Sequence, residues 1–428
     1  MTLLTTATFA DIITFTRSSP GTYWGEDGLL ATAATNEPRL EWSPVSALAG
    51  LSVQRRTVTL TRGQWSLSMA GTGSVAVRIA GRLVATATSA TRRRIYVRAD
   101  DTAVELTPLG SVTAWDLRAG LGFLVEGQSR VNIALHNRDL TNAAWVDTDI
   151  TAAKDQTGID GAANAASSIT ATAGNATILQ SITSASAARF TTAYVRRLVG
   201  SGVVEMTQNG GSTWTPVTVT DEWARVSIPS ATLANPEVGF RIVTSGDSIA
   251  VDYVQVENSA FATSAIATEG VSVTRGADIP VIEGAVFSKF YNQQQGTIYI
   301  ESAVVTNAMA ITCISDGTLN NRMQISTSGI AAFQYAVVNS GVVVAQIGIG
   351  TNVFPNFYSI SGALQNDNCI ICVDGELSAE DTDVSLPVFN ILHFGRLSGG
   401  ELPATYYIRR LDYCPRRRVN AELQKITG

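Results

Sequence analysis

The stretch Val75-Ala76-Val77-Arg78-Ile79-Ala80 alternates branched apolar side chains with small or charged ones. Successive side chains of a strand point to opposite faces, so this period of two predicts a strand with one buried face. The same rhythm recurs at residues 57–61 and 217–219, and turn-forming residues at 71–73 and 209–212 separate such runs. Short strands with Gly, Asn and Ser between them are typical of sandwiches and jelly rolls. We therefore expect an all-β protein of tandem β-sandwich or jelly-roll modules.

One helical signal lies at the end of the chain. Asn420-Ala421-Glu422-Leu423-Gln424-Lys425 combines good helix formers with Asn420 as a candidate N-cap. We expect a short C-terminal helix there.

Composition narrows the class of protein. The 428 residues are enough for two to four domains, and they carry 30 basic and 36 acidic side chains, a net charge of −6. With 45% hydrophobic and only 15% charged residues, the chain is neither disordered nor a general nucleic-acid binder. No apolar run is long enough to span a membrane, and the N-terminus is a poor signal peptide, so we expect synthesis in the cytoplasm and a soluble product.

Tryptophan and cysteine divide the chain near residue 283. All seven tryptophans precede this point, and all four cysteines follow it. Two cores of different composition would explain the division, so we predict a domain boundary here.

Several stretches resemble virion proteins of phages, prophages and gene-transfer agents. Residues 15–24 and 34–39 are similar to the opening of these proteins, and residues 122–132 are similar to a segment that follows it. Residues 139–145 resemble the start of a carbohydrate-binding-module-like jelly roll, which closes at residues 254–257 and is followed by the similar stretches 261–264 and 273–278. Residues beyond 283, including 296–301 and 410–417, resemble a laminin-G/concanavalin-like lectin domain.

The resemblance implies four segments. They are an N-terminal attachment segment at 1–45, an inserted small β-sandwich at 46–120, the jelly roll at 121–282 and the lectin domain at 283–428. The insertion is where this chain departs from the family's pattern.

Sugar recognition combines flat apolar faces with short polar or planar charged groups. Trp214 follows a Gly-rich loop, and Tyr194, Arg196 and Asn209 belong to the same module, so these four form the candidate glycan-binding site. Trp145 and Trp223 lie in motifs of the family and are interpreted as core residues.

Other motifs leave alternatives open. Residues 352–358 and 365–368 form either a ligand rim or strand and hairpin residues. The arginine runs at 92–94 and 416–418 either bind anionic polysaccharide or phosphate, or are solvated strand ends. Cys369 and Cys372 have zinc-knuckle spacing, but on a strand they would point to opposite faces, which favours buried free thiols. We expect no metal and no cofactor.

The resemblance implies a tail fibre or head spike that binds host cell-surface glycans. Its expected partners are cell-surface polysaccharide and other virion proteins, as a homotrimer exposed on the particle surface, without nucleic acid or membrane insertion. Two histidines and no nucleophile motif predict that it is not an enzyme. A purely structural connector and a carboxylate-only glycan-degrading enzyme are the alternatives.

Overall fold

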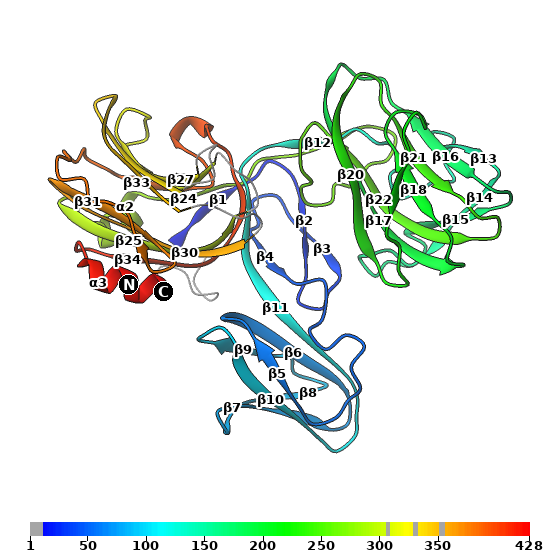
Figure 1. Ribbon diagram of the computed structural model, residues 1–428, viewed down its shortest axis with the longest axis horizontal. Coiled ribbons are helices and arrows are strands. Elements are labelled where there is room, and N and C mark those ends of the chain that lie inside the picture. Colours follow the sequence, from blue (N-terminus) through cyan, green and yellow to red (C-terminus); the bar gives the residue numbers. More distant parts are fainter. Residues whose placement is uncertain (1–11, 305–308, 328–332, 351–355) are drawn as a thin grey trace.

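The computed structural model describes residues 12–304, 309–327, 333–350 and 356–428, which form β-sandwiches around separate cores (Figure 1). The all-β class predicted from the sequence is confirmed. The helical elements are short: α2 (Gly284–Phe290), the 3-10 turn η1 (Ser398–Gly400) and α3 (Asn420–Thr427). Among the described residues, no helix has the length and apolar character needed to cross a membrane.

The C-terminal sandwich is built from a seven-stranded and a nine-stranded sheet. The first runs in the order β1 (Thr14–Thr16), β24 (Ile279–Glu283), β33 (Ile391–Phe394), β26 (Ala310–Ser315), β27 (Arg322–Thr327), β28 (Phe333–Asn339) and β29 (Val342–Ile349). The second runs in the order β32 (Glu376–Leu377), β31 (Asn368–Val373), β30 (Asn356–Gln365), β25 (Gln295–Val304), β34 (Thr405–Cys414), β11 (Val112–Glu126), β6 (Gly63–Gly71) and β9 (Arg93–Val97), with β4 (Arg39–Trp42) also paired to β11.

The strand β11 belongs to two modules at once. Its first part pairs with β6, and its last residues, from Phe123 to Glu126, pair with β34. The first part closes a small sandwich with a four-stranded sheet in the order β5 (Arg56–Leu60), β10 (Thr102–Leu109), β7 (Ser74–Ile79) and β8 (Arg82–Thr88). The inserted module is therefore joined to the C-terminal sandwich by a continuous strand (Figure 1).

The jelly roll consists of two five-stranded sheets that enclose one core. One runs in the order β13 (Val146–Thr148), β16 (Ala176–Ser181), β21 (Glu237–Ile242), β18 (Val204–Thr207) and β19 (Thr215–Val217). The other runs in the order β14 (Ile150–Gln156), β15 (Ala166–Ala171), β22 (Ser248–Glu257), β17 (Ala187–Val199) and β20 (Ala224–Leu233). Trp145 is buried in this core, which agrees with its interpretation as a core residue.

The structure corrects the boundaries drawn from the sequence. The 120/121 boundary falls inside β11, and Phe123 and Val125 are buried in the C-terminal sandwich. Phe15, from the predicted attachment segment, is buried in the same core. The strand changes partners at a bulge between Gly120 and Gly122, and the sequence carries no signal for such a bulge.

The described part of the N-terminal segment, residues 12–45, lies where the three modules meet (Figure 1). It contains the hairpin of β2 (Gly21–Trp24) and β3 (Leu30–Ala33), and a second strand pair, β12 (Arg130–Asn132) with β23 (Val273–Arg275), lies nearby along the exit of the jelly roll. The backbone N–H of Leu30 donates to the carbonyl of Ile159 at 3.0 Å, which ties the hairpin to the jelly roll. Glu26 accepts from Arg94 at 2.7 Å, which ties the hairpin to the inserted module.

A buried ionic cluster, here called the arginine joint, holds this meeting point together. Its members have side chains at most 1% exposed and are Arg17, Arg39, Glu126, Arg275 and Asp278. Arg39 reaches Glu126 at 2.7 Å and Asp278 at 2.5 Å, Arg17 reaches Asp278 at 3.2 Å, and Arg275 reaches Glu126 at 3.2 Å. Every member lies in a stretch that carries the family resemblance, so these motifs build the joint.

Two helical details differ from the sequence analysis. The C-terminal helix forms, but its N-cap is Val419, and no side chain caps it. Asn420 instead accepts from Arg417 and donates to Glu380. The helix α2 was not predicted, because its seven residues are too few to show a helical period.

Candidate functional site

A groove of about 570 Å³ lies on the outer face of the nine-stranded sheet, between the inserted module and helix α3. We call it the seam groove. It is lined by Arg62, Arg98, Thr297, Tyr299, Arg410, Asp412, Tyr413, Cys414, Arg418, Lys425, Ile426 and Gly428. This volume is within the range of sites for small ligands, about 300–1,000 Å³.

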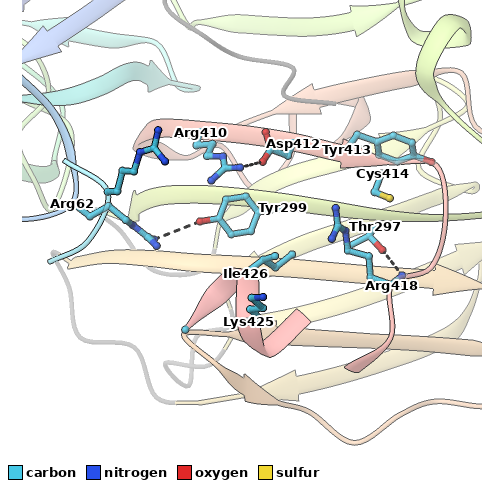
Figure 2. Close-up of a pocket in the computed structure, with 12 residues that line it drawn as sticks. Arg62, Thr297, Tyr299, Arg410, Asp412, Tyr413, Cys414, Arg418, Lys425 and Ile426 are labelled. Carbon is cyan, nitrogen blue, oxygen red and sulfur yellow. Dashed lines mark hydrogen bonds and ion pairs between the residues drawn. The ribbon is translucent and has the colours of Figure 1, made fainter. Parts of the chain in front are cut away.

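The floor of the seam groove follows from strand alternation on β25 and β34. Ile298 and Ile300 enter the core, so Thr297 and Tyr299 face outward. The register places Thr297 beside Cys414 and Tyr299 beside Asp412. Figure 2 shows these side chains in one row along the sheet, with Arg410 above Tyr299.

Helix α3 forms one wall because its apolar side covers the neighbouring part of the sheet. Leu423 is fully buried against Ala363, Ile370 and Cys372 of β30 and β31. This packing leaves Lys425 and Ile426 at the edge of the seam groove (Figure 2).

The inserted module forms the opposite end through Arg62. Its guanidinium lies 3.6 Å from Glu301 and donates to the hydroxyl of Ser359. The carbonyl of Arg62 accepts from Arg409 at 3.4 Å, and its N–H donates to Asp100 at 2.7 Å. These contacts dock the inserted module onto the C-terminal sandwich and fix one end of the groove.

The lining is strongly basic, with five cationic residues and a single acid, Asp412. Arg410 forms an ion pair with Asp412, and its guanidinium lies 5.1 Å from the centre of the Tyr299 ring. Burial raises the pKa of the Tyr299 hydroxyl, and its hydrogen bond with Ser359 opposes that shift, so the phenol is neutral at physiological pH. The groove therefore offers fixed positive charge together with neutral hydrogen-bonding groups.

The structure separates the four glycan-binding residues predicted from the sequence. Trp214 and Asn209 lie at the sheet that contains β18 and β21, where Arg241 points away from the core between buried Phe240 and Ile242. The guanidinium of Arg241 lies 4.7 Å from the centre of the Trp214 ring. Trp214 is half-buried, so it offers less open surface than an exposed platform.

Asn209 braces the loop that precedes Trp214. Its side-chain oxygen accepts from the hydroxyl of Thr207 and from the backbone N–H of Thr213, both at 2.9 Å. This is a structural role within the turn.

Tyr194 and Arg196 lie on the opposite side of the jelly roll. Ala193 and Val195 of β17 are buried in the core, so Tyr194 and Arg196 face outward from the other sheet. Tyr194 is nevertheless only 5% exposed because the β2–β3 hairpin covers it, with the Trp24 ring 5.7 Å away. The prediction that it lies near Trp214 is wrong.

Arg196 contacts Gln156 at 3.1 Å and lies 5.2 Å from the ring centre of Trp223. Trp223 is half-buried and packs against the cluster that contains Tyr194. These contacts agree with the interpretation of Trp223 as a framework residue.

The remaining sequence motifs are the cysteines and the predicted ligand rim. Cys369 lies in the main core and Cys372 beneath α3, on opposite faces of β31 as alternation predicts. All four cysteines are free, and no group of three or more His, Cys, Asp or Glu side chains in the described ranges could hold a metal ion. Residues 352–355 of the predicted rim lie outside the described residues.

One segment of the seam groove, the arginine run at 416–418, carries a signal in the sequence, but the groove as a whole does not. The arginine run at 416–418 was noted as a possible anion site, and Arg418 lines the groove. Arg62, Arg98 and Arg410 gave no signal, because only the docking of separate modules brings them together.

No family model and no curated protein matches the chain. Solved structures show low similarity, among them a heptameric SAP-like pentraxin from Limulus polyphemus (10% identity, TM-score 0.27, covering 32% of this chain and 70% of the pentraxin). The tandem CBM22 domain of Paenibacillus barcinonensis Xyn10C is 8% identical (TM-score 0.24, covering 66% of this chain and 97% of that one). Botulinum neurotoxin type C, whose cell entry depends on two ganglioside molecules, is 11% identical (TM-score 0.28, covering 35% of this chain), and our chain spans 39% of that chain's length. Similarity this low identifies no ligand and no activity.

Proposed function

We propose that this protein is an adhesion component of a phage-like particle, a tail fibre or head spike, that binds cell-surface glycans through the seam groove. The observation that carries the proposal is the groove itself, a cavity of about 570 Å³ at the junction of two modules. Hydroxyl, carboxylate and guanidinium groups line it, and these are the groups that hydrogen-bond the hydroxyls of a sugar.

The placement on a particle rests on the sequence resemblance of residues 15–39, 122–145 and 254–278. Multivalent display on a particle would raise the avidity of weak single sites. Homotrimer formation and contact with other virion proteins belong to the same proposal. We also propose that the protein has no catalytic activity.

Cys414 offers a direct test of the groove as the binding site. It lines the groove and is half-buried, whereas Cys313, Cys369 and Cys372 are buried. A bulky maleimide attached to its thiol would fill the groove without a change in sequence. Binding to a glycan array is expected to fall at least tenfold after labelling, and the Cys414→Ser variant is expected to keep its binding in the presence of the reagent.

The Trp214 face remains the second candidate surface. Glycan-array binding of the Trp214→Ala variant distinguishes the two candidate surfaces, because Trp214 lies on the jelly roll and Cys414 on the C-terminal sandwich. Loss with Trp214→Ala alone would assign binding to the jelly roll. Absence of glycan binding by the unlabelled protein would favour a structural connector.

A further inference from the structure

We infer that the seam groove selects acidic glycans, saccharides that carry a carboxylate or a phosphate. The inference rests on the proposed glycan-binding function and adds the chemical class of the ligand. Its evidence is that some of the positive charges that line the groove have acidic partners and others do not.

Two of the five cations are already neutralised. Arg410 is paired with Asp412, and Arg62 lies 3.6 Å from the buried Glu301. The other three, Arg98, Arg418 and Lys425, form no side-chain ion pair or hydrogen bond with any residue in the described part of the chain. The hydrogen bonds of Arg418 are made by its backbone: its N–H donates to Thr297 at 2.9 Å, and its carbonyl accepts from Arg417 at 2.7 Å.

The three unpaired cations come from three separate parts of the chain. Arg98 follows β9 of the inserted module, Arg418 follows β34, and Lys425 lies on α3. The nearest acid on the helix, Glu422, is engaged by Arg416 at 2.9 Å. Like charges that converge on one groove repel each other, and an anionic ligand would relieve this repulsion.

The sign of the groove is opposite to that of the whole chain, which has a net charge of −6. Clefts of one sign concentrate ligands of the other sign and accelerate their association. Arginine also binds carboxylate and phosphate groups in a bidentate manner. Arg98 and Arg418 are free to do this.

The rest of the lining favours a saccharide over a nucleic acid. Recognition of single strands relies on open aromatic faces for base stacking. Tyr299 is 3% exposed and lies beneath Arg410, so it offers no such face. The guanidinium donors of the groove can instead bind the hydroxyls of a saccharide.

The test compares matched oligosaccharides that differ only in charge. Neutral, carboxylated and phosphorylated forms of one oligosaccharide are titrated calorimetrically against the full chain at low and high salt. The double variant Arg418→Ala/Lys425→Ala removes two of the unpaired cations. The control, Arg82→Ala/Lys289→Ala, removes two exposed positive charges elsewhere.

We expect the acidic forms to bind at least tenfold more tightly than the neutral form, with the preference reduced by salt. The groove variant should lose this preference, and the control should behave as wild type. Comparison of the affinities for the carboxylated and the phosphorylated oligosaccharide identifies which anion is preferred.

Equal affinity for neutral and acidic forms would overturn the inference and leave the proposed function in place. Tighter binding of single-stranded RNA or DNA of equal charge would also overturn it, in favour of a nucleic-acid site. Absence of binding to every saccharide would remove the proposed function as well.

Discussion

Arginine has two different roles in this chain, and only tertiary structure distinguishes them. Arg17, Arg39 and Arg275 are buried and paired in the arginine joint, whereas Arg98 and Arg418 face the seam groove without an acid partner. The sequence motifs pointed to the first group, because those residues lie in the stretches that carry the family resemblance. In the second group, Arg418 belongs to the arginine run at 416–418, but Arg98 could not be predicted, since it lies in an ordinary local sequence.

At the same scale, Glu126 predicts how stability depends on pH. Burial alone would raise its pKa, but Arg275 and Arg39 outweigh burial and lower it to about 2. A carboxylate with a lowered folded-state pKa contributes stability above its ordinary pKa of 4.5 and loses it as the pH falls toward 2. At about 1.4 kcal/mol per pKa unit, the contribution is at most about 3 kcal/mol.

Glu126→Gln is therefore expected to lower the melting temperature at pH 7 and to have a smaller effect at pH 3. Thermal unfolding of both proteins at the two pH values measures this. The half-buried Glu105, paired with the exposed Arg55 on the inserted module, gives a control in Glu105→Gln. An equal loss for Glu126→Gln at both pH values would contradict the ionic role.

At the scale of elements, local pattern predicted some strands correctly and others not: of the run at 217–219, only Val217 belongs to a strand, β19 (Thr215–Val217). Residues 57–60 and 75–79 form β5 and β7 as their alternation indicated. The continuation of β11 beyond residue 120 was missed, because the strand changes partners at a bulge between Gly120 and Gly122. A bulge of this kind depends on the partner strands and leaves no periodic signal.

Gly122 is the position where this change of partner is most sensitive to substitution. Its φ is +109°, and a Cβ there would lie 2.4 Å from the carbonyl oxygen of Ile408. Gly122→Ala should therefore destabilise the fold by more than the about 1–3 kcal/mol typical of backbone strain, seen as a lower melting temperature. Gly348→Ala on β29 is the control, since its Cβ would meet only Phe333 at 3.5 Å. Equal melting temperatures for the two variants would refute the strain at β11.

At the scale of the whole molecule, composition predicted separate cores but could not show how they are joined. Trp145 lies in the jelly-roll core and Cys369 in the C-terminal core, but Trp65 and Trp115 lie in the core of the inserted module, so the division near residue 283 does not separate just two cores. The position of residues 12–45 between the modules could not be predicted, because it depends on long-range pairing such as that of Phe15 with Pro280. The seam groove, formed by two modules, was hidden for the same reason.

The arginine joint therefore predicts how the modules unfold. Arg39 contacts Glu126, Asp278 and the hydroxyl of Ser264, the last at the exit of the jelly roll. Removing one partner from a buried ionic cluster leaves uncompensated charge and costs about 3–5 kcal/mol. Because the lost interactions join the modules, Arg39→Ala should leave each sandwich able to fold and should weaken the coupling between the sandwiches.

Differential scanning calorimetry of Arg39→Ala should accordingly show the unfolding transition broadened or divided into separate transitions, with one at a lower temperature than in wild type. Arg55→Ala is the matched control, because Arg55 is 71% exposed in its pair with Glu105. An exposed pair contributes about 0–1 kcal/mol, so the control should follow the wild-type trace. If Arg39→Ala also follows it, the joint does not couple the modules, and their arrangement must depend on the β2–β3 hairpin and the continuity of β11.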